Sequence, residues 1–407
     1  MKVLHTSDWH LGQKFLTKDR LEEHQLALDW MYELIIAEQV DVLIVAGDIF
    51  DIGSPPNYAR KLYYSFLTRL LNTPCRHVVI IGGNHDSPTM LEAPKALLEQ
   101  LNIHIIGAVP EDPKDQLITL KNKEGQPEGL IAAVPFLRDR DLRTSTTAET
   151  GLQRIEMIKK AITQHYVQIG EWVEALAPQD IPVIATGHLY ASGAIASDKQ
   201  DNIYIGDKEN IKADQFPSCF DYVALGHIHR PQIIGDHSNV RYSGSIIPLS
   251  FSETKDDKSI YLLEFEAKTL KAIHPYPIPV FRRLKTIQGD YETVKEKLLT
   301  FAKRHEKELK AWLEVIVESK KVIPNLSLEL NELVADLNVE LLKVRVAKTA
   351  ASKAKPKIQE ELSDLEALDV FRKKCAVLGD LPDEINDLEH TFKELQNWMQ
   401  ENPLYED

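Results

Sequence analysis

Gly82-Gly83-Asn84-His85-Asp86 directly follows the apolar run His77-Val78-Val79-Ile80-Ile81, which is typical of a buried β-strand. The two glycines allow the backbone to turn sharply, and the turn presents an amide, an imidazole and a carboxylate in succession. Folding a turn does not require this trio, whereas a metal site with an adjacent acid–base group does. An ordinary turn is the alternative if the stretch is taken alone, because Asn and Asp are common turn residues.

The sequence around this stretch alternates between apolar, strand-like runs and amphipathic helices. This alternation predicts an α/β layered domain, in which ligands bind at the carboxyl ends of the strands. Segment 108–130 has the composition of a loop. The predicted strands are 2–6, 40–46, 77–81, 103–106, 130–135, 181–185 and 221–225, and the predicted helices are 20–38, 57–71, 90–101 and 151–177.

The composition limits the classes of protein that the chain can represent. Its 407 residues predict two or three domains, and it contains no apolar run of membrane-spanning length and no signal peptide. Three scattered cysteines predict reduced thiols in the cytoplasm and no cysteine-based zinc site. The net charge of −14 argues against coating of nucleic acid by an evenly basic surface. It still allows a phosphate-bearing substrate held by metal ions, because bound cations reverse the local field.

Side chains that bind metals recur at the ends of the predicted strands. Mixed carboxylate, imidazole and amide ligands favour Mn²⁺, Fe or Zn²⁺ over Ca²⁺, and they are too numerous for one ion. Two ions sharing a carboxylate would use all of them, which is a common arrangement for phosphoester cleavage. Taken singly, His188 would be a surface residue and Asp48 a helix cap. The clusters are Asp8 with His10, Asp48 with Asp51, Asn84-His85-Asp86, His188, and His227 with His229.

Two of these clusters place metal-type residues two positions apart. Asp8 precedes His10 by two residues, and His227 precedes His229 by two. In an extended segment such residues point the same way, so we expect each pair to reach one ion from an extended backbone.

The ordered set of clusters resembles the calcineurin-like metallophosphoesterases. Longer phrases are similar to the bacterial SbcD family, the Mre11-like nuclease subunits of SbcCD complexes. This resemblance implies an α/β fold, with a four-layer α-β-β-α sandwich over residues 1–275, a small α+β capping domain and a C-terminal helical segment. The phrases are His5-Thr6-Ser7-Asp8-Trp9-His10-Leu11-Gly12, Ala46-Gly47-Asp48-Ile49-Phe50-Asp51, Gly83-Asn84-His85-Asp86-Ser87 and Pro135-Phe136-Leu137-Arg138-Asp139-Arg140-Asp141.

The resemblance also implies a role for each site residue. His85 would donate a proton to the leaving oxygen, oriented by Asp86, with Ser7 and Asp51 in supporting positions. The cofactor would be two Mn²⁺ ions, with Mg²⁺ or Fe²⁺ as alternatives. One ion would be held by Asp8, His10, Asp48 and His229, and the other by Asp48, Asn84, His188 and His227, with Asp48 as the bridge.

The activity implied by the resemblance is a manganese-dependent DNA nuclease. It would act as a double-strand 3′–5′ exonuclease and a single-strand or hairpin endonuclease in DNA repair, recombination and replication. Such a protein would be cytoplasmic and associated with the nucleoid. Two alternatives remain, a metallophosphodiesterase acting on small phosphoesters and a non-catalytic scaffold that kept the fold.

The proline-rich stretch Pro275-Tyr276-Pro277-Ile278-Pro279 predicts a linker to the rest of the chain. Residues 278–348 have a β-α-β-α-β pattern, and the resemblance assigns them as a capping, DNA-binding domain; a plain accessory domain is the alternative. Arginines near acidic residues are candidate DNA contacts, although each one also suits a solvated surface. They are Arg138, Arg140, Arg143, Arg282 and Arg283.

The end of the chain predicts a partner. Residues 349–361 form a basic linker, and 362–407 contain two amphipathic helices with narrow apolar stripes. Such stripes require a partner surface, and the resemblance implies an SbcC/Rad50-type, SMC-like ATPase as well as a homodimer within a heterotetramer. Packing of these helices back onto the chain is the alternative. The stripe residues assigned to the partner are Leu368, Phe371, Leu388, Phe392, Leu395 and Trp398.

Overall fold

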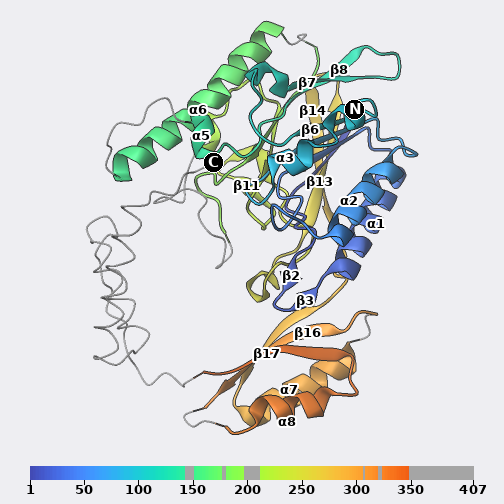
Figure 1. The fold of residues 1–407 in the computed structure, drawn as a ribbon, viewed down its shortest axis with the longest axis vertical. Coiled ribbons are helices and arrows are strands. Elements are labelled where there is room, and N and C mark those ends of the chain that lie inside the picture. Colours follow the sequence, from blue (N-terminus) through green and yellow to red (C-terminus); the bar gives the residue numbers. More distant parts are fainter. Residues whose placement is uncertain (143–150, 177–179, 197–210, 306–307, 320–322, 348–407) are drawn as a thin grey trace. The chain divides into compact units, whose positions relative to one another are not determined.

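The structure is a computed structural model that describes residues 1–142, 151–176, 180–196, 211–305, 308–319 and 323–347 (Figure 1). Two six-stranded sheets form its main part, in the orders β14-β13-β1-β4-β5-β6 and β11-β12-β10-β9-β8-β7. The first sheet contains β1 (Lys2–Thr6), β4 (Val42–Ala46), β5 (His77–Ile81), β6 (Ile103–Ile106), β13 (Ser259–Glu266) and β14 (Thr269–Pro277). The second contains β7 (Leu117–Lys121), β8 (Pro127–Ala132), β9 (Val183–His188), β10 (Tyr222–Gly226), β11 (Gln232–Ile234) and β12 (His237–Tyr242).

Alternation along the central strands explains how the layers pack. In β4, Leu43 and Val45 face the helices, whereas Val42 and Ile44 face the second sheet. The parallel strands β1, β4, β5 and β6 are covered on both faces, which is why they are almost continuously apolar. An apolar core built from side chains of both sheets therefore lies between them.

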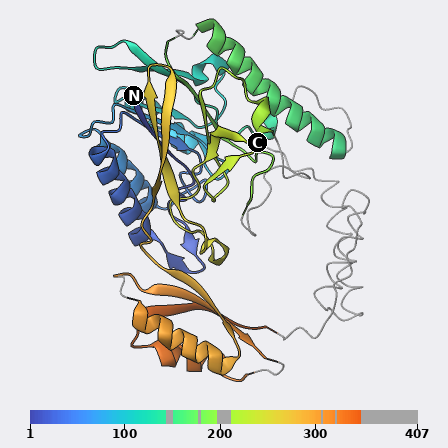
Figure 2. The ribbon, with the colours of Figure 1, turned by 180° about the vertical axis from the view of Figure 1, so that it is seen from behind.

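Helices cover the outer faces of both sheets (Figures 1 and 2). The helices α1 (Leu21–Ala37) and α2 (Asn57–Leu70) pack on the first sheet, and α6 (Gly151–Leu176) packs on the second. The predicted α-β-β-α sandwich is confirmed. Shorter elements are β2 (Lys14–Phe15), β3 (Lys18–Asp19), α3 (Pro88–Glu92), α4 (Lys95–Glu99), η1 (Pro113–Gln116), α5 (Asp139–Leu142), η2 (Ala213–Gln215) and η3 (Phe251–Glu253). No described helix is both long enough and apolar enough to cross a bilayer.

Three local predictions differ from the structure. Segment 108–130 is not a loop but contains β7 and the start of β8, which ends at Ala132 and overlaps the predicted strand 130–135; the half-exposed edge strand β7 gives only a weak apolar signal. The predicted helix 90–101 is two short helices, because Pro94 interrupts the helical hydrogen bonding. The predicted linker begins later than expected, since β14 runs to Pro277. Its prolines are tolerated because β14 is an edge strand.

A smaller lobe follows β14. Its elements alternate in the predicted β-α-β-α-β order and form a three-stranded parallel sheet, β15-β16-β17. Leu313, Val315 and Val317 of the middle strand share one apolar core with both helices. The elements are β15 (Leu284–Gly289), α7 (Tyr291–Arg304), β16 (Ala311–Glu318), α8 (Leu326–Val334) and β17 (Val339–Ala347). The predicted linker and terminal helices, 349–361 and 362–407, lie outside the described residues.

Candidate metal centre

The metal-type residues all follow the carboxyl ends of parallel strands. Three clusters come from the first sheet, after β1, β4 and β5, and two come from the second sheet, at the ends of β9 and β10. The two sheets meet at this end of the sandwich, as shown by the hydrogen bond from the backbone N–H of His227 to Oδ1 of Asp8, at 3.0 Å. The topology therefore gathers residues that are far apart in sequence.

The backbone at these strand ends is left-handed, not extended as predicted for both pairs, and His227 and His229 fall into different groups of candidate ligands rather than one. The φ angles are 51° at Asp8, 47° at His10, 49° at Asp48 and 96° at His227. Non-glycine residues rarely adopt these angles, and such strain concentrates at functional sites. Backbone hydrogen bonds compensate for it, since Asp8 N–H donates to Gly47 O at 3.0 Å and His10 N–H to Asp48 O at 3.0 Å.

Two glycines are required by the close approach of neighbouring segments. A Cβ on Gly226 would lie 1.8 Å from the carbonyl oxygen of Ala46, and a Cβ on Gly83 would lie 2.2 Å from Oδ1 of Asp48. Neither distance is possible for a real side chain. Gly226 therefore lets the strand ends of the two sheets come together, and Gly83 lets the neighbouring turns after β4 and β5 do so within the first sheet.

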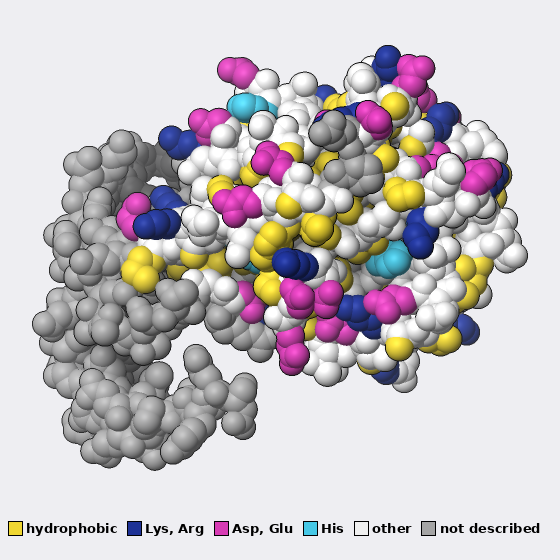
Figure 3. Space-filling view, turned by 90° about the horizontal axis from the view of Figure 1, so that it is seen from above, with side chains coloured by type: hydrophobic (Ala, Val, Ile, Leu, Met, Phe, Trp, Pro, Cys, Tyr) yellow, Lys and Arg dark blue, Asp and Glu magenta, His cyan; other side chains and the backbone are white. Residues whose placement is uncertain are grey.

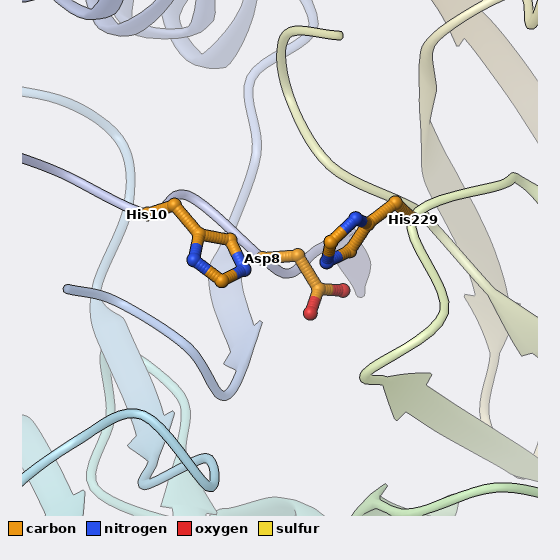
Figure 4. A group of neighbouring side chains, drawn as sticks. All are labelled: Asp8, His10 and His229. Atoms are coloured by element: carbon orange, nitrogen blue, oxygen red, sulfur yellow. The ribbon is translucent and has the colours of Figure 1, made fainter. Parts of the chain in front are cut away.

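The first ligand group consists of Asp8, His10 and His229, with the two rings on either side of the carboxylate (Figure 4). Their ligand atoms lie within 4.8 Å of one another. Nδ1 of His10 contacts Oδ1 of Asp51 at 3.1 Å, whereas its buried Nε2 has no hydrogen-bond partner among the described residues. A buried, unsatisfied ring nitrogen among carboxylates is the arrangement that a metal ion completes.

The second group consists of Asp48, His188 and His227, again within 4.8 Å. Nε2 of His188 lies 3.0 Å from Oδ1 of Asn84 and 3.2 Å from Oδ2 of Asp48. Nδ1 of His188 must donate to the carbonyl of Ala46, at 2.9 Å, which leaves Nε2 as the ligand atom. Oδ2 of Asp48 is also 3.6 Å from Nε2 of His10, so this carboxylate lies between the two groups.

The electrostatics of the metal-free residues fit a cation site. Burial opposes protonation of His10, but the hydrogen bond to Asp51 and the nearby Asp48 and Asp8 carboxylates raise its pKa to about 9. Burial opposes protonation of His188 as well, and Asp48 raises its pKa to about 9. Burial alone would raise the pKa of Asp48, yet the histidines hold it well below its usual range. The buried carboxylates thus stabilise positive charge, and the donor set suits divalent transition-metal ions.

His85 lies beside the ligands but is exposed, as expected for a group that meets a substrate. Its ring is 5.0 Å from the His10 ring, and its Nδ1 is 2.8 Å from the carbonyl oxygen of Asp51. The prediction that Asp86 orients this ring is wrong. The buried Asp86 carboxylate instead accepts the backbone N–H groups of Ile49, Phe50 and Gly83 at 2.9–3.1 Å, so it ties the turn after β5 to the segment after β4.

Support for the first ligand group includes two residues that sequence reasoning missed. Oε1 of Glu253 lies 3.2 Å from Nδ1 of His229, and Lys258 pairs with the same carboxylate at 2.7 Å. Burial would raise the pKa of Glu253, but the His229 hydrogen bond and the Lys258 charge hold it well below its usual range. In sequence, these residues resemble a polar surface turn. The predicted supporting role of Ser7 agrees with its hydrogen bond to Oδ2 of Asp8, at 2.5 Å.

The structure describes the side chains of only some of the candidate DNA-contacting arginines. Arg138 is half-buried and donates to the carbonyl of Asp86 at 2.9 Å, so it braces the turn that carries His85. The prediction for Arg282 is wrong, because its guanidinium is buried and paired with Glu22 and Glu23. The side chain of Arg140, the residue Arg143, and the partner-binding stripe at Leu368, Phe371, Leu388, Phe392, Leu395 and Trp398 lie outside the described residues.

Comparisons with known proteins agree with this geometry. Residues 1–231 match the family model of the calcineurin-like phosphoesterases. Residues 280–377 match a family model described as the type 5 capsule protein repressor C-terminal domain, which continues beyond β17. The chain belongs to the calcineurin-like phosphoesterases and, within them, to the SbcD family of SbcCD nuclease subunits. Membership of this family implies divalent metal ions, and the two groups described above are candidate ligands for them.

The relatives cover most of the chain. The SbcD component of the nuclease SbcCD from Escherichia coli K12 is 38% identical over 379 residues, which is 93% of each chain. The protein of the same name from Rhodobacter capsulatus is 36% identical, over 69% of this chain and 70% of that one. Among solved structures, a dimetal phosphatase from Danio rerio aligns at 14% identity and covers 68% of this chain and 98% of that one. Its TM-score of 0.37 is too low to support an argument.

Proposed function

We propose that the chain is a DNA nuclease that hydrolyses phosphodiester bonds with two divalent metal ions. The main support for the proposal is that Asp48 of the second ligand group also lies next to His10 of the first group, with the exposed His85 ring beside them. The residues that would hold the ions are Asp8, His10, Asp48, Asn84, His188, His227 and His229. When bound, two such ions neutralise the charge of a phosphodiester and lower the pKa of an attacking water.

The chain's own contribution to the chemistry is positioning and proton transfer. The carbonyl of Asp51 accepts a hydrogen bond from Nδ1 of His85, which leaves Nε2 to give its proton to the leaving sugar oxygen. Asp48 accepts the backbone N–H of His85 at 2.9 Å. The carboxylate that would bind both ions therefore also holds the main chain of the proposed general acid in place. A well-placed general acid contributes roughly 10²–10⁴-fold in rate.

The small lobe supports a nucleic-acid substrate, and we propose that 278–348 is a DNA-binding, capping domain. A groove of about 790 Å³ lies between β15 and α7. Its lining includes Arg283, Lys285, Lys297 and Arg304. These cations suit phosphate groups. Elsewhere charges are mixed, and the face in Figure 3 shows basic and acidic side chains interspersed. The net charge of −14 is consistent with local rather than general attraction of DNA.

The finer activity that we propose is manganese-dependent, with 3′–5′ exonuclease action on duplex ends and endonuclease action on single strands and hairpins. The test uses the full chain, stripped of metal and reloaded with Mn²⁺, Mg²⁺ or Fe²⁺, on end-labelled linear and hairpin DNA and on a nitrophenyl phosphodiester. We expect DNA cleavage to be fastest with Mn²⁺. Faster turnover of the small ester than of DNA would instead support the small-substrate alternative.

A matched pair of variants tests the chemistry of the site. His85→Ala is expected to bind metal ions and DNA normally but to lose cleavage by roughly 10²–10⁴-fold, because only the proton donor is removed. His188→Ala is expected to lose a metal ion as well as activity. Cleavage by His85→Ala at the wild-type rate would show that another group is the acid.

We also propose that the chain acts within a larger complex, as the names of its relatives state for those proteins. The partner would be an SbcC/Rad50-type ATPase that binds the apolar stripes of 362–407, within a heterotetramer built on a dimer of this chain. Such a complex would lie in the cytoplasm at the nucleoid. Truncation after residue 355 should abolish co-purification with the ATPase and spare metal-dependent cleavage. Co-purification of the truncated chain would place the partner surface elsewhere.

A further inference from the structure

Glu253 is a buried carboxylate at the end of η3, within reach of the first ligand group but outside every cluster of the sequence. Its side chain is 2% exposed. Oε1 faces Nδ1 of His229 at 3.2 Å, and Oε2 accepts the backbone N–H of Leu249 at 3.0 Å. Both oxygens are therefore held, and one of them is directed at a predicted metal ligand.

Lys258 completes this arrangement. Its buried ammonium group donates to Oε2 of Glu253 at 2.7 Å, to the hydroxyl of Ser245 at 2.8 Å and to the backbone carbonyl of His229 at 2.7 Å. The lysine thus balances the carboxylate charge and also holds the main chain of His229. His229 is consequently fixed twice, through its ring by Glu253 and through its backbone by Lys258.

The ring contact determines which nitrogen can bind a metal. A carboxylate accepts a hydrogen bond only from a protonated nitrogen, so Glu253 selects the Nδ1–H form of His229 and leaves Nε2 bare. His188 is fixed in the same way by a backbone carbonyl, and His10 by Asp51. Unlike Asp51, whose side chain is 27% exposed, Glu253 is sealed from solvent, so water cannot replace it.

We propose that Glu253, charge-balanced by Lys258, is the positioning residue for His229 and thereby determines the affinity of the first metal position, formed by Asp8, His10 and His229. This inference rests on the proposed function of the cluster as a metal centre. Removing such a supporting carboxylate typically weakens metal binding about 10–100-fold. The second position, around His188 and His227, has no contact with Glu253 among the described residues and should keep its affinity.

The experiment compares the full-length chain with Glu253→Ala, Glu253→Gln and the control Glu266→Ala, whose side chain is exposed at the end of β13. Mn²⁺ binding is measured by isothermal titration calorimetry after metal removal, and folding is checked by thermal unfolding. In Glu253→Ala we expect one of two sites to weaken about 10–100-fold. Glu253→Gln should recover only part of the loss, since its amide oxygen can still accept from Nδ1 but its NH₂ group cannot accept from the backbone N–H of Leu249 or from Lys258. Glu266→Ala should match the wild type.

A second measurement is made on the wild-type chain, and a variant serves only to assign the signal. The wild-type chain, labelled with ¹⁵N-histidine, is expected to show the Nδ1–H tautomer at His229, identified by the signal that is lost in His229→Gln. A wild-type ring protonated on Nε2, or a folded Glu253→Ala that binds two ions as tightly as the wild type, would overturn the inference. Absence of Mn²⁺ binding by the wild type would instead contradict the proposed function itself.

Discussion

Asp8, His10, Asp48 and His227 present their side chains from left-handed backbone conformations. Each such residue costs about 1–2 kcal/mol relative to an ordinary conformation, so the surrounding structure must enforce it. The backbone hydrogen bonds from Asp8 to Gly47 and from His10 to Asp48 lock the two loops together. These hydrogen bonds of the fold therefore hold the two ligand-bearing loops in place.

A single methyl group should disrupt this arrangement. In Gly226→Ala the new Cβ would meet the Ala46 carbonyl, 1.8 Å away, and the strand ends of the two sheets would have to separate. We expect the free energy of unfolding to fall by about 1–3 kcal/mol and Mn²⁺ binding to weaken, measured by urea unfolding and calorimetry. Gly53→Ala is the matched control, since its nearest neighbour would be 3.6 Å away. Equal stability of the two variants would contradict this prediction.

Residues that act within a short motif could be predicted from the sequence, whereas those that act through tertiary contacts could not. Asn84 and His85 stand directly after a strand and two glycines, and that local pattern locates them. Glu253 precedes Thr254 and Lys255 in a polar segment, and only the packing of η3 against His229 reveals its burial. Arg282 looks like a phosphate contact in sequence, but its acidic partners belong to a distant helix.

At the scale of elements, α1 is joined to the small lobe by a buried ionic cluster. Oε1 of Glu23 accepts from Nε of Arg20 at 3.1 Å and from Nε of Arg282 at 2.9 Å. The Arg282 guanidinium also lies over the Trp312 ring, 4.1 Å from its centre. Glu23 of α1 therefore binds Arg282, and Arg282 in turn packs on Trp312 of β16. These contacts connect the first helix of the sandwich with the lobe.

Breaking this cluster should destabilise the chain. Arg282→Ala removes one partner of the buried Glu23 together with the contact on Trp312, and loss of one member of a buried ion pair typically costs about 3–5 kcal/mol. Arg20 still pairs with Glu23, so we expect a loss near the lower end, about 3 kcal/mol, in urea unfolding. The control is the neighbouring Arg283→Ala, expected to change stability by less than about 1 kcal/mol. A larger loss of unfolding free energy in Arg283→Ala than in Arg282→Ala would show that the cluster does not stabilise the chain.

Predictability at this scale followed the strength of the hydrophobic pattern. The strands β4 and β5 were predicted within two residues, because strands buried on both faces are continuously apolar. The strand β7 was missed, because its exposed Thr119 and Lys121 interrupt the apolar pattern at the sheet edge, whereas the predicted strand 130–135 overlaps the end of β8. The order of domains was also evident, although β14 extends into the proline-rich stretch that predicted a linker.

At the scale of the whole molecule, two buried histidines make folding sensitive to acid. Burial lowers the pKa of His5 and that of His24 to about 3, from 6.5. Below pH 6.5 these histidines therefore bind protons in the unfolded chain but stay neutral in the folded chain. The free energy of unfolding consequently decreases as the pH falls from 6.5 toward 3. Each of the two histidines should lower the free energy of unfolding by about 2 kcal/mol between pH 7.5 and pH 5.0.

A difference between variants isolates this effect. His10 and His188 have raised pKa values in the metal-free chain and contribute with the opposite sign, so wild-type stability alone does not report on His24. We expect His24→Gln to reduce the acid-induced loss of unfolding free energy by about 2 kcal/mol, measured with urea in the presence of a chelator. The control His237→Gln, at an exposed position, should leave the pH dependence unchanged. Identical pH profiles for wild type and His24→Gln would contradict the prediction.

The separation in sequence of the two sheets has a consequence for the chain during its synthesis. Asp8 and the backbone of His227, which are in contact, are 219 residues apart, so the metal centre cannot close until the ribosome has delivered both halves. A chain that ends before His188 holds only the ligands of the first sheet, so neither group can assemble, because the first group also requires His229. Both groups of candidate ligands are therefore complete only after the chain has been synthesised through His229.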